Sequence, residues 1–316
     1  MQLGRSERDD RAFFTVKDAT LNNLNRAIMA NKASLQQIPE RLDIRVDWAF
    51  HHFFRKKKHL VKIIKDLLDL DIEVIEYLPN LLDTAVEKDK RSVFDVACRN
   101  AKTGETFVLE MQRTDESDMM DRLYYYGGSL IHNQVEKGNL KYVVNSVLVC
   151  CIATYDVRHN DRVPAAKVFF RYRMMENDTH EVFDGDKLNI CFLELKRFGN
   201  YLKPDSDLRE QWCWIFNNLA NFVERPKNLD SSFDDVIRDA ETRKLSEKQK
   251  KDYMKALELN ERDRLVIYEG GYNRGMVDGM EKGKNEIAKN LLDMGMQPSD
   301  VAKATGLTKE AVSALK

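Results

Sequence analysis

The sequence predicts an α/β fold: a β-sheet covered by helices on both faces, followed by a helical C-terminal extension. Three observations support this prediction. Apolar residues recur at three- and four-residue spacing over residues 46–70, which is typical of an amphipathic helix. Two apolar segments flank a polar turn within residues 93–112, which is typical of a hairpin. The nearly continuous apolar run at residues 142–154 suits a central strand buried on both faces.

The remaining elements follow in chain order. A short strand at residues 72–77 comes before the hairpin and stops at Pro79. After the hairpin, a helix is predicted from a Ser117 cap to Gly138, over about residues 117–136. The order up to the apolar strand is therefore αβββαβ. Further elements are expected as strands at 166–173 and 188–195 and as charged helices at 208–267.

Composition separates the chain into four expected parts. These are a polar segment at 1–40, expected to be disordered, an α/β domain at 41–200, a helical extension at 201–268 and a tail at 269–316. The segment 1–40 has no apolar core of the length that a secretory signal needs. The longest apolar run is too short to span a bilayer. We therefore expect a soluble, cytoplasmic protein without a membrane partner.

Charge and cysteine content exclude two classes of protein. The 51 basic and 52 acidic residues give a net charge of −1, so there is no global attraction to nucleic acid. Five cysteines, most of them in apolar runs without a CxxC spacing, indicate reduced buried thiols and exclude a disulfide framework. His51, His52 and His59 share one helical stretch, where a solvated helix face is favoured over a metal site.

The hairpin places two acids opposite each other. If Asn100 pairs with Glu105 across the turn, the antiparallel register sets Asp95 opposite Glu110. Directly opposed side chains lie about 4.5–5.5 Å apart at Cβ, where like charges are destabilising. Such a pair persists if one acid is protonated or if a cation lies between them. Alternation along the second strand puts Gln112 on the same face as Glu110.

Six short strings resemble a known family in the same order. They are Asp47-Trp48-Ala49-Phe50 with Phe54, Glu76-Tyr77-Leu78-Pro79, Phe94-Asp95-Val96-Ala97-Cys98-Arg99, Val108-Leu109-Glu110-Met111-Gln112, Arg122-Leu123-Tyr124-Tyr125-Tyr126 with Gly138 and Tyr142, and Leu193-Glu194-Leu195-Lys196-Arg197-Phe198. Together they resemble the PD-(D/E)XK nuclease superfamily, and more narrowly its bacterial recombination-promoting nuclease and transposase family. The resemblance covers roughly residues 45–200. Two positions depart from the pattern: Gln112 stands where the superfamily has lysine, and His51 follows Phe50 where the family has lysine.

The resemblance implies a restriction-endonuclease-like fold with a central mixed sheet and a metal-dependent DNA endonuclease that acts in transposition or recombination. Asp95 and Glu110 would be the carboxylate ligands, and the resemblance adds the Met111 carbonyl as a third. Oxygen ligands of this kind suit Mg²⁺ or Mn²⁺. Gln112 would orient water or a phosphate oxygen, and Asp47 would be an additional acid near the metal. Double-stranded DNA is the expected partner, and a homodimer is a candidate assembly.

Several alternatives stay open. An Asp–Glu pair across a hairpin is often a solvated edge. The fold also occurs in proteins that bind nucleic acid or protein without cutting, and RNA would suit the same metal chemistry as DNA. Arg122 fits a phosphate contact or a helix-surface ion pair. The basic run Arg55, Lys56, Lys57 and Lys58 fits either a DNA contact or a solvated helix face.

The tail has two separate features. Gly271, Gly275, Gly279 and Gly283 recur every fourth residue, which fits either close packing of another helix or a flexible linker. Residues 287–316 resemble a helix-turn-helix in which Thr308 caps the recognition helix. That last helix is short, so a packing or partner-binding module is an alternative to base recognition.

Overall fold

The structure is a computed structural model that describes residues 38–78, 95–115, 118–135, 142–157, 159 and 163–315, with the backbone alone at 264–278 and 281. The predicted segment 1–40 therefore lies almost entirely outside the described residues, as do Pro79, Ser117 and Gly138. The described chain forms two compact units, and the boundary between them falls in the sequence between Leu257 and Glu258.

The first unit has the predicted element order, with one correction. Its elements are α2 (Asp47–Phe54), α3 (Lys57–Leu68), β1 (Ile75–Tyr77), β2 (Val96–Asn100), β3 (Thr106–Gln112), α4 (Met119–His132), β4 (Val147–Ala153), β5 (Phe169–Tyr172), β6 (Leu188–Glu194), the 3-10 helix η1 (Leu195–Arg197), α5 (Leu208–Asn218), η2 (Ser231–Phe233), α6 (Asp234–Asp239), η3 (Thr242–Lys244) and the start of α7 (Glu247–Asp293). The strands predicted at 72–77, 142–154 and 166–173 are shorter than expected.

The first predicted helix is two helices, because the chain leaves the helical conformation at Lys56 (φ −82°, ψ 109°). The break allows the ring of His59 to stack on Phe53 with centroids 4.3 Å apart. Apolar spacing continues across the break, since Phe53 and Leu60 both face the core. Periodicity therefore could not reveal it.

One mixed sheet organises this unit, with the strand order β1-β2-β3-β4-β6-β5. Strands β3, β4 and β6 are parallel, whereas β1, β2 and β5 run antiparallel to their neighbours. Strand β4 is buried along its whole length, as the apolar run predicted. The restriction-endonuclease-like arrangement of a central mixed sheet between helices is confirmed.

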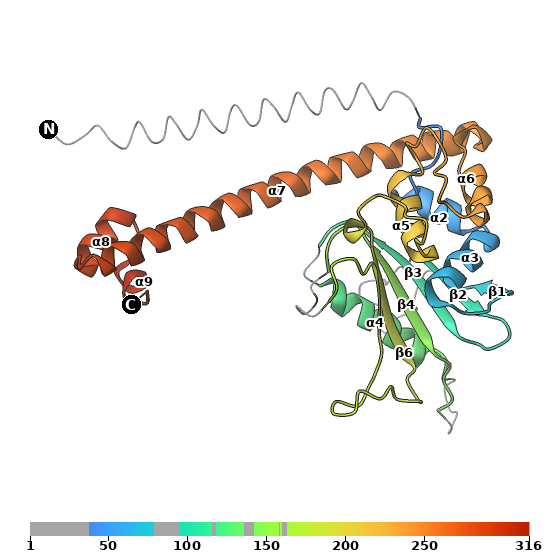
Figure 1. Cartoon of the computed structure of the whole chain (residues 1–316), viewed down its shortest axis with the longest axis horizontal. Helices are drawn as coiled ribbons and strands as arrows, with labels where there is room; N and C mark the ends of the chain where they lie inside the picture. Colours follow the sequence, from blue (N-terminus) through green and yellow to red (C-terminus); the bar gives the residue numbers. More distant parts are fainter. Residues whose placement is uncertain are drawn as a thin grey trace, which may run out of the picture. The chain divides into compact units, whose positions relative to one another are not determined.

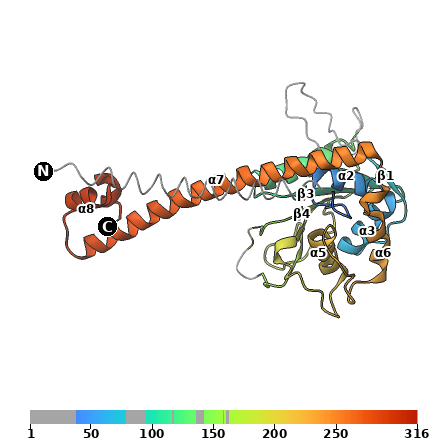
Figure 2. The same ribbon diagram turned by 90° about the horizontal axis from the view of Figure 1, so that it is seen from above.

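Helices cover both faces of the sheet (Figures 1 and 2). Helices α2, α3 and α5 pack on the face formed by alternate residues such as Cys98 and Leu109. Helix α4 packs on the other face, against residues such as Ala97 and Val108. The helical segment after residue 200 shares the first core, since Trp212, Phe233 and Tyr253 are fully buried there.

Local chemistry fixes the hairpin turn. The Asn100 carbonyl accepts from the Gly104 N–H at 2.9 Å, and its side chain accepts from the Lys102 N–H at 3.0 Å. Gly104 has φ +76°, a conformation that glycine adopts without strain. The N–H of Asn100 donates to the Glu105 carbonyl, which is the predicted pairing.

The five cysteines are buried and free, as expected: Cys98, Cys150, Cys151, Cys191 and Cys213. Among the described residues, no helix has both the length and the apolar character that crossing a membrane requires.

The second unit contains the end of α7, α8 (Pro298–Thr305) and α9 (Lys309–Ser313). A small core holds it together, formed by Ala288, Val301, Ala302 and Val312. The glycine repeat lies within the continuous helix α7. A Cβ built on Gly279 or Gly283 would meet no atom within 4 Å, so the described residues around them leave both positions open.

Candidate metal centre

The two acids of the hairpin face each other as predicted. The register pairs Val96 with Leu109, and extending it by one residue sets Asp95 opposite Glu110. The N–H of Asp95 donates to Oε2 of Glu110 at 3.2 Å. The N–H of Met111 donates to Oδ2 of Asp95 at 2.7 Å. Asp95 directly precedes β2, and Glu110 lies in β3. The pairing of these two strands therefore holds the two carboxyl groups close together.

Glu110 is buried and Asp95 is half-buried, and burial changes the protonation of the pair. Glu110 is 4 % exposed. Burial and the neighbouring Asp95 together raise the pKa of Glu110 to about 8, against the opposing effects of its hydrogen bonds and of Arg122. Burial also raises the pKa of Asp95, against the opposing effects of the Met111 N–H and of His51. Glu110 therefore holds a proton at neutral pH when no cation is present.

Gln112 and Arg122 contact the Glu110 carboxyl. The Gln112 amide donates to Oε1 of Glu110 at 3.1 Å, which confirms that the two side chains share a face. A guanidinium nitrogen of Arg122, on α4, lies 3.7 Å from the same oxygen. Arg122 is about one-third exposed, so its guanidinium faces both the acid and the solvent.

The Met111 carbonyl lies on the same side of β3 as Asp95. In an antiparallel pair, the N–H and C=O of one residue point toward the same neighbouring strand. The N–H of Met111 points toward Asp95, so its carbonyl also points toward the β2 side. This backbone oxygen is therefore directed toward the region of the two acids.

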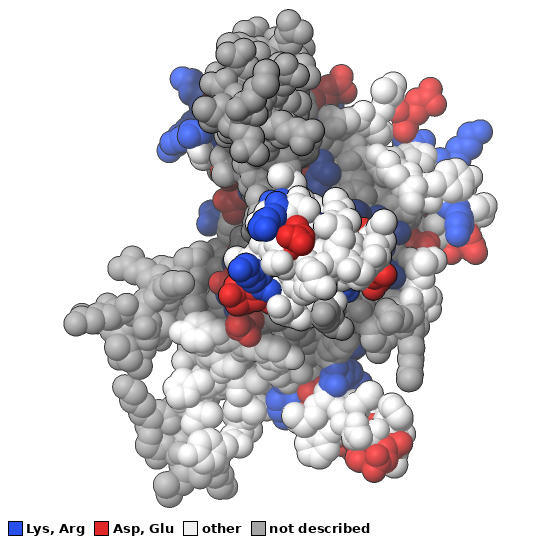
Figure 3. Space-filling model, turned by 90° about the vertical axis from the view of Figure 1, so that its left-hand side faces the viewer, with Lys and Arg blue, Asp and Glu red and all other residues white. Residues whose placement is uncertain are grey.

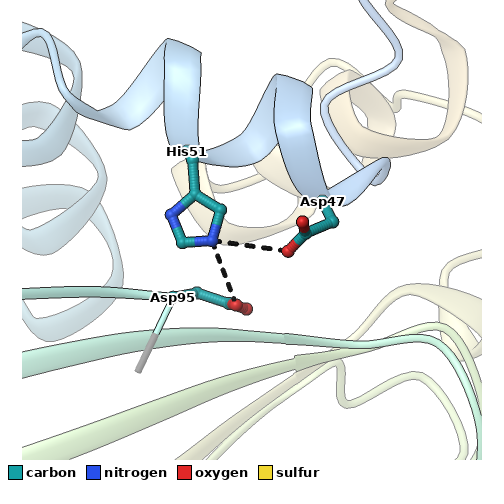
Figure 4. A group of neighbouring side chains, drawn as sticks. All are labelled: Asp47, His51 and Asp95. Carbon is teal, nitrogen blue, oxygen red and sulfur yellow. Dashed lines mark ion pairs between the residues drawn. The ribbon is translucent and has the colours of Figure 1, made fainter. Parts of the chain in front are cut away.

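Helix α2 adds a second group of potential ligands. Nε2 of His51 lies 3.3 Å from Oδ1 of Asp47 and 3.6 Å from Oδ1 of Asp95 (Figure 4). These three side chains offer ligand atoms within 4.8 Å of one another. The hydrogen bond with Asp47 raises the pKa of His51, with burial opposing, and the same hydrogen bond lowers the pKa of Asp47.

The predicted solvated histidine face is wrong. His59 is 1 % exposed and its Nε2 lies 3.1 Å from Oδ2 of Asp239. His51 is half-buried and joins the acids, whereas His52 stacks on Trp48 with centroids 4.8 Å apart. The four-residue spacing of Asp47 and His51, which places both on one helix face, was the signal that could have found His51.

The basic run after α2 is divided between the protein interior and the solvent. Nζ of Lys58 lies 2.5 Å from Oδ2 of Asp239, and Nζ of Lys56 donates to the Asp239 carbonyl at 3.2 Å. Arg55 and Lys57 are exposed and form no ion pair within the described part of the chain. Only part of the run therefore remains available to a phosphate.

Comparison with known families identifies the family of the chain. A family model described as "PD-(D/E)XK nuclease family transposase" matches residues 44–268, which is more than two thirds of the chain. The chain belongs to this family. The match includes Asp47, Asp95 and Glu110, and it confirms the membership predicted from the six strings. No curated protein and no solved structure gives a match.

The tail of this nuclease-family chain matches a second model, described as "Rpn/YhgA-like nuclease family, C-terminal HTH domain", over residues 281–316. Helix α8 ends at Gly306 (φ +71°), and the Thr308 side chain caps α9 by accepting from the Ala311 N–H at 3.1 Å. The predicted helix-turn-helix is confirmed, and α9 has only five residues. On the face seen in Figure 3, described acidic and basic side chains are interspersed, so neither sign dominates there.

Proposed function

We propose that the protein is a Mg²⁺- or Mn²⁺-dependent DNA endonuclease that acts in transposition or recombination. One observation carries the proposal: the buried carboxyl group of Glu110 and the half-buried carboxyl group of Asp95 face each other at the start of the hairpin, next to His51 and Arg122. A fold gains nothing from this like-charge pair by itself. A divalent cation would relieve the repulsion and restore both charges.

The donor set fits such a cation. The carboxylates of Asp95 and Glu110 and the Met111 carbonyl would hold it, and these hard oxygen donors are what Mg²⁺ and Mn²⁺ prefer. When bound there, the cation would acidify a water molecule and neutralise phosphate charge. Asp47 and His51 lie next to Asp95, where they would extend the donor set.

The side chains around the acids would prepare the substrate. The Gln112 amide, which donates to Glu110, would orient a water molecule or a phosphate oxygen. Arg122 would grip a phosphate oxygen from the α4 side, because a guanidinium presents several donors in one plane. Exposed Arg55 and Lys57 would add sequence-independent phosphate contacts. The C-terminal helix-turn-helix would contribute a second contact with double-stranded DNA.

A plasmid-nicking experiment tests the proposal. The full chain is incubated with supercoiled DNA and Mg²⁺ or Mn²⁺, beside Asp95→Ala, Glu110→Ala and Glu105→Ala. Glu105 lies in the same hairpin but outside the acid pair, so its variant is the matched control. We expect loss of either site acid to reduce nicking by more than the roughly 10–100-fold typical of losing a residue that only supports a metal ligand, with the control unchanged.

Two results would redirect the proposal. Equal nicking by all variants would show that the cleavage comes from elsewhere. A chain that shifts DNA in a gel but never nicks it would favour a binding protein on the same fold, which the replacement of lysine by Gln112 makes a real alternative. The same assay with single-stranded RNA distinguishes the two nucleic acids.

A further inference from the structure

Glu194 is a fully buried carboxyl group that the proposed nuclease activity does not use. It lies at the carboxyl end of β6, where its Oε1 contacts Nε2 of His159 and its Oε2 accepts from the Val157 N–H at 3.2 Å. The other ring nitrogen of His159, Nδ1, contacts the hydroxyl of Tyr172, the last residue of β5. A carboxyl group, an imidazole and a phenol therefore form one hydrogen-bonded row.

The imidazole of His159 is held in one orientation. Its ring stacks on Phe170 with centroids 4.0 Å apart, and its side chain is 4 % exposed. An ionised carboxylate has no hydrogen to donate, so Nε2 carries the proton that it shares with Glu194. In the neutral ring Nδ1 is then an acceptor, and the Tyr172 hydroxyl donates to it. This is the tautomer that a general base needs if it is to take the phenol proton.

Tyr172 is the accessible end of the row. It is 47 % exposed, and the edge of its ring packs against Phe192 with centroids 6.0 Å apart. Burial and Glu194 raise the pKa of the phenol, with Arg197 opposing, so the hydroxyl keeps its proton at neutral pH. Such a phenol becomes a nucleophile when a neighbouring base removes the proton. A nucleophile, a base in contact with it and a third group that orients the base are the signature of covalent catalysis.

Two cationic side chains lie beside the row. Nζ of exposed Lys167 lies 5.1 Å from the centroid of the Phe170 ring, and the guanidinium carbon of Arg197 lies 5.4 Å from it. Arg197 donates from Nε to the Lys167 carbonyl and from Nη2 to the Pro164 carbonyl, both at 2.9 Å. These bonds fix the guanidinium and leave it further donors. Cations beside a nucleophile favour an anionic substrate, and phosphate is the anion that a guanidinium binds best.

The row shares a face and an edge of the sheet with the acid centre. The register pairs Gln112 with Ala153 and Ala153 with Glu194. Neighbouring strands are about 4.8 Å apart, so Glu194 lies about 10 Å from Gln112 along the sheet. Glu194 follows Phe192 by two residues, and Phe192 and Ala153 both face α4. A DNA strand bound across this face would meet both sites.

We propose that Tyr172 is the nucleophile of a second reaction, in which it bonds covalently to a DNA phosphate, with His159 as the base and Glu194 as a positioning residue. The Tyr172 oxygen attacks phosphorus, and the bond between phosphorus and one deoxyribose oxygen breaks. The phenol proton passes to Nδ1 of His159 and then to the leaving oxygen, which becomes a hydroxyl. One phosphate ester replaces another, so the step needs no oxidant, reductant or second substrate. DNA as the substrate rests on the proposed function, whereas the acid centre takes no part in this step.

Denaturing gels test the proposal, because a covalent bond between protein and DNA survives detergent. The full chain is incubated in EDTA with radiolabelled DNA, either single-stranded or duplex, so that metal-dependent hydrolysis is silent. We expect the label to migrate with the native protein and not with Tyr172→Phe. Tyr201→Phe is the matched control, since Tyr201 is 69 % exposed and lies outside the row. His159→Gln should form the labelled band roughly 10²–10⁴-fold more slowly, which is the usual contribution of a general base.

Either of two results would overturn the proposal: no labelled band from the native chain, or an equal band from Tyr172→Phe. This variant keeps the ring that packs on Phe192, and urea unfolding checks its stability. If it does not fold, mass spectrometry of the digested native adduct decides, because a nucleotide attached to any residue other than Tyr172 contradicts the proposal.

The two proposed reactions fail separately. A chain that nicks plasmid DNA with Mg²⁺ but forms no labelled band refutes the covalent step and leaves the nuclease intact. A labelled band in EDTA from a chain that never nicks DNA does the reverse.

Discussion

Two clusters of buried charge lie in the first unit, and they differ in how their acids are neutralised. At Asp239, partial burial raises the carboxyl pKa, but hydrogen bonds from Lys58 and His59 outweigh it and lower the pKa to about 2. At Glu110, burial and the nearby Asp95 outweigh Arg122 and raise the pKa to about 8. One acid is charged under all ordinary conditions, whereas the other holds a proton at neutral pH.

The contrast separates a structural cluster from the proposed metal centre. The lysines at Asp239 stabilise the junction of α3 with α6, so nothing further is needed there. At the hairpin, burial and the opposed Asp95 outweigh the effect of Arg122 on Glu110, and burying a carboxylate in this way is costly. A site that is incomplete without a cation is typical of functional centres. This is why we place metal binding at the hairpin and not at Asp239.

The largest expected effect is on the stability of the metal-free protein as pH rises. Unfolded glutamate loses its proton near pH 4.5, whereas folded Glu110 keeps it until about 8. Between these values the folded state binds more protons, so the free energy of unfolding falls as pH rises. We expect a loss of order several kcal/mol, since each pKa unit corresponds to about 1.4 kcal/mol.

Urea unfolding in EDTA, at several pH values, measures this loss. Glu110→Gln should remove most of this pH-dependent loss of stability, and added Mg²⁺ should reduce the loss in the native chain. A native profile that matches the variant's would show that Glu110 is not protonated in the folded state.

The second expected effect is a loss of stability when the acid of the other cluster is neutralised. Asp239→Asn leaves Lys58 and buried His59 without their carboxylate, so it should lower the free energy of unfolding by about 1–3 kcal/mol at neutral pH. Glu110→Gln should cost little under the same metal-free conditions. Parallel urea titrations compare the two variants, and equal destabilisation would remove the distinction between the clusters.

A third change places a positive charge beside Glu110. Gln112→Lys would place an ammonium group beside Glu110, where a nearby cation lowers a carboxyl pKa. We expect the fall in the free energy of unfolding between pH 6 and 9 to be about 1–2 kcal/mol smaller in this variant than in the native chain. Unfolding at pH 6 and 9 measures it. An unchanged profile would mean that the lysine extends away from Glu110.

The smallest effect concerns the two neighbouring histidines of α2. His51→Gln should weaken Mn²⁺ binding, because His51 lies beside Asp95. The loss should not exceed roughly tenfold, because Mn²⁺ prefers carboxylate ligands to imidazole. His52→Gln is the matched control, since His52 stacks on Trp48. Calorimetric titration with Mn²⁺ measures both, and an equal affinity for the two variants would exclude a role for His51.

The hairpin was predictable because local chemistry determines it. The Asn100 turn and the two-residue alternation of its strands set the register, and the register sets Asp95 opposite Glu110. The family strings then supplied the order of elements around it. Buried strand β4 was equally predictable, although its start came later than its apolar run suggested.

The break between α2 and α3 could not be predicted in this way. It is stabilised where His59 and Lys58 meet Asp239, which lies 180 residues after His59. No local pattern links positions so distant, and the apolar spacing continues through the break. The same long-range contacts decided which lysines of the basic run remain free for solvent.

The turn at residues 101–104 constrains how this chain can vary over evolutionary time. Adding or deleting one residue there would slip the register by one position and turn Glu110 toward the core beneath α2 and α3. The side chains in the turn are exposed and their identity matters little beyond Gly104. Among descendants of this sequence, the length of that turn should therefore be preserved even where its composition drifts freely.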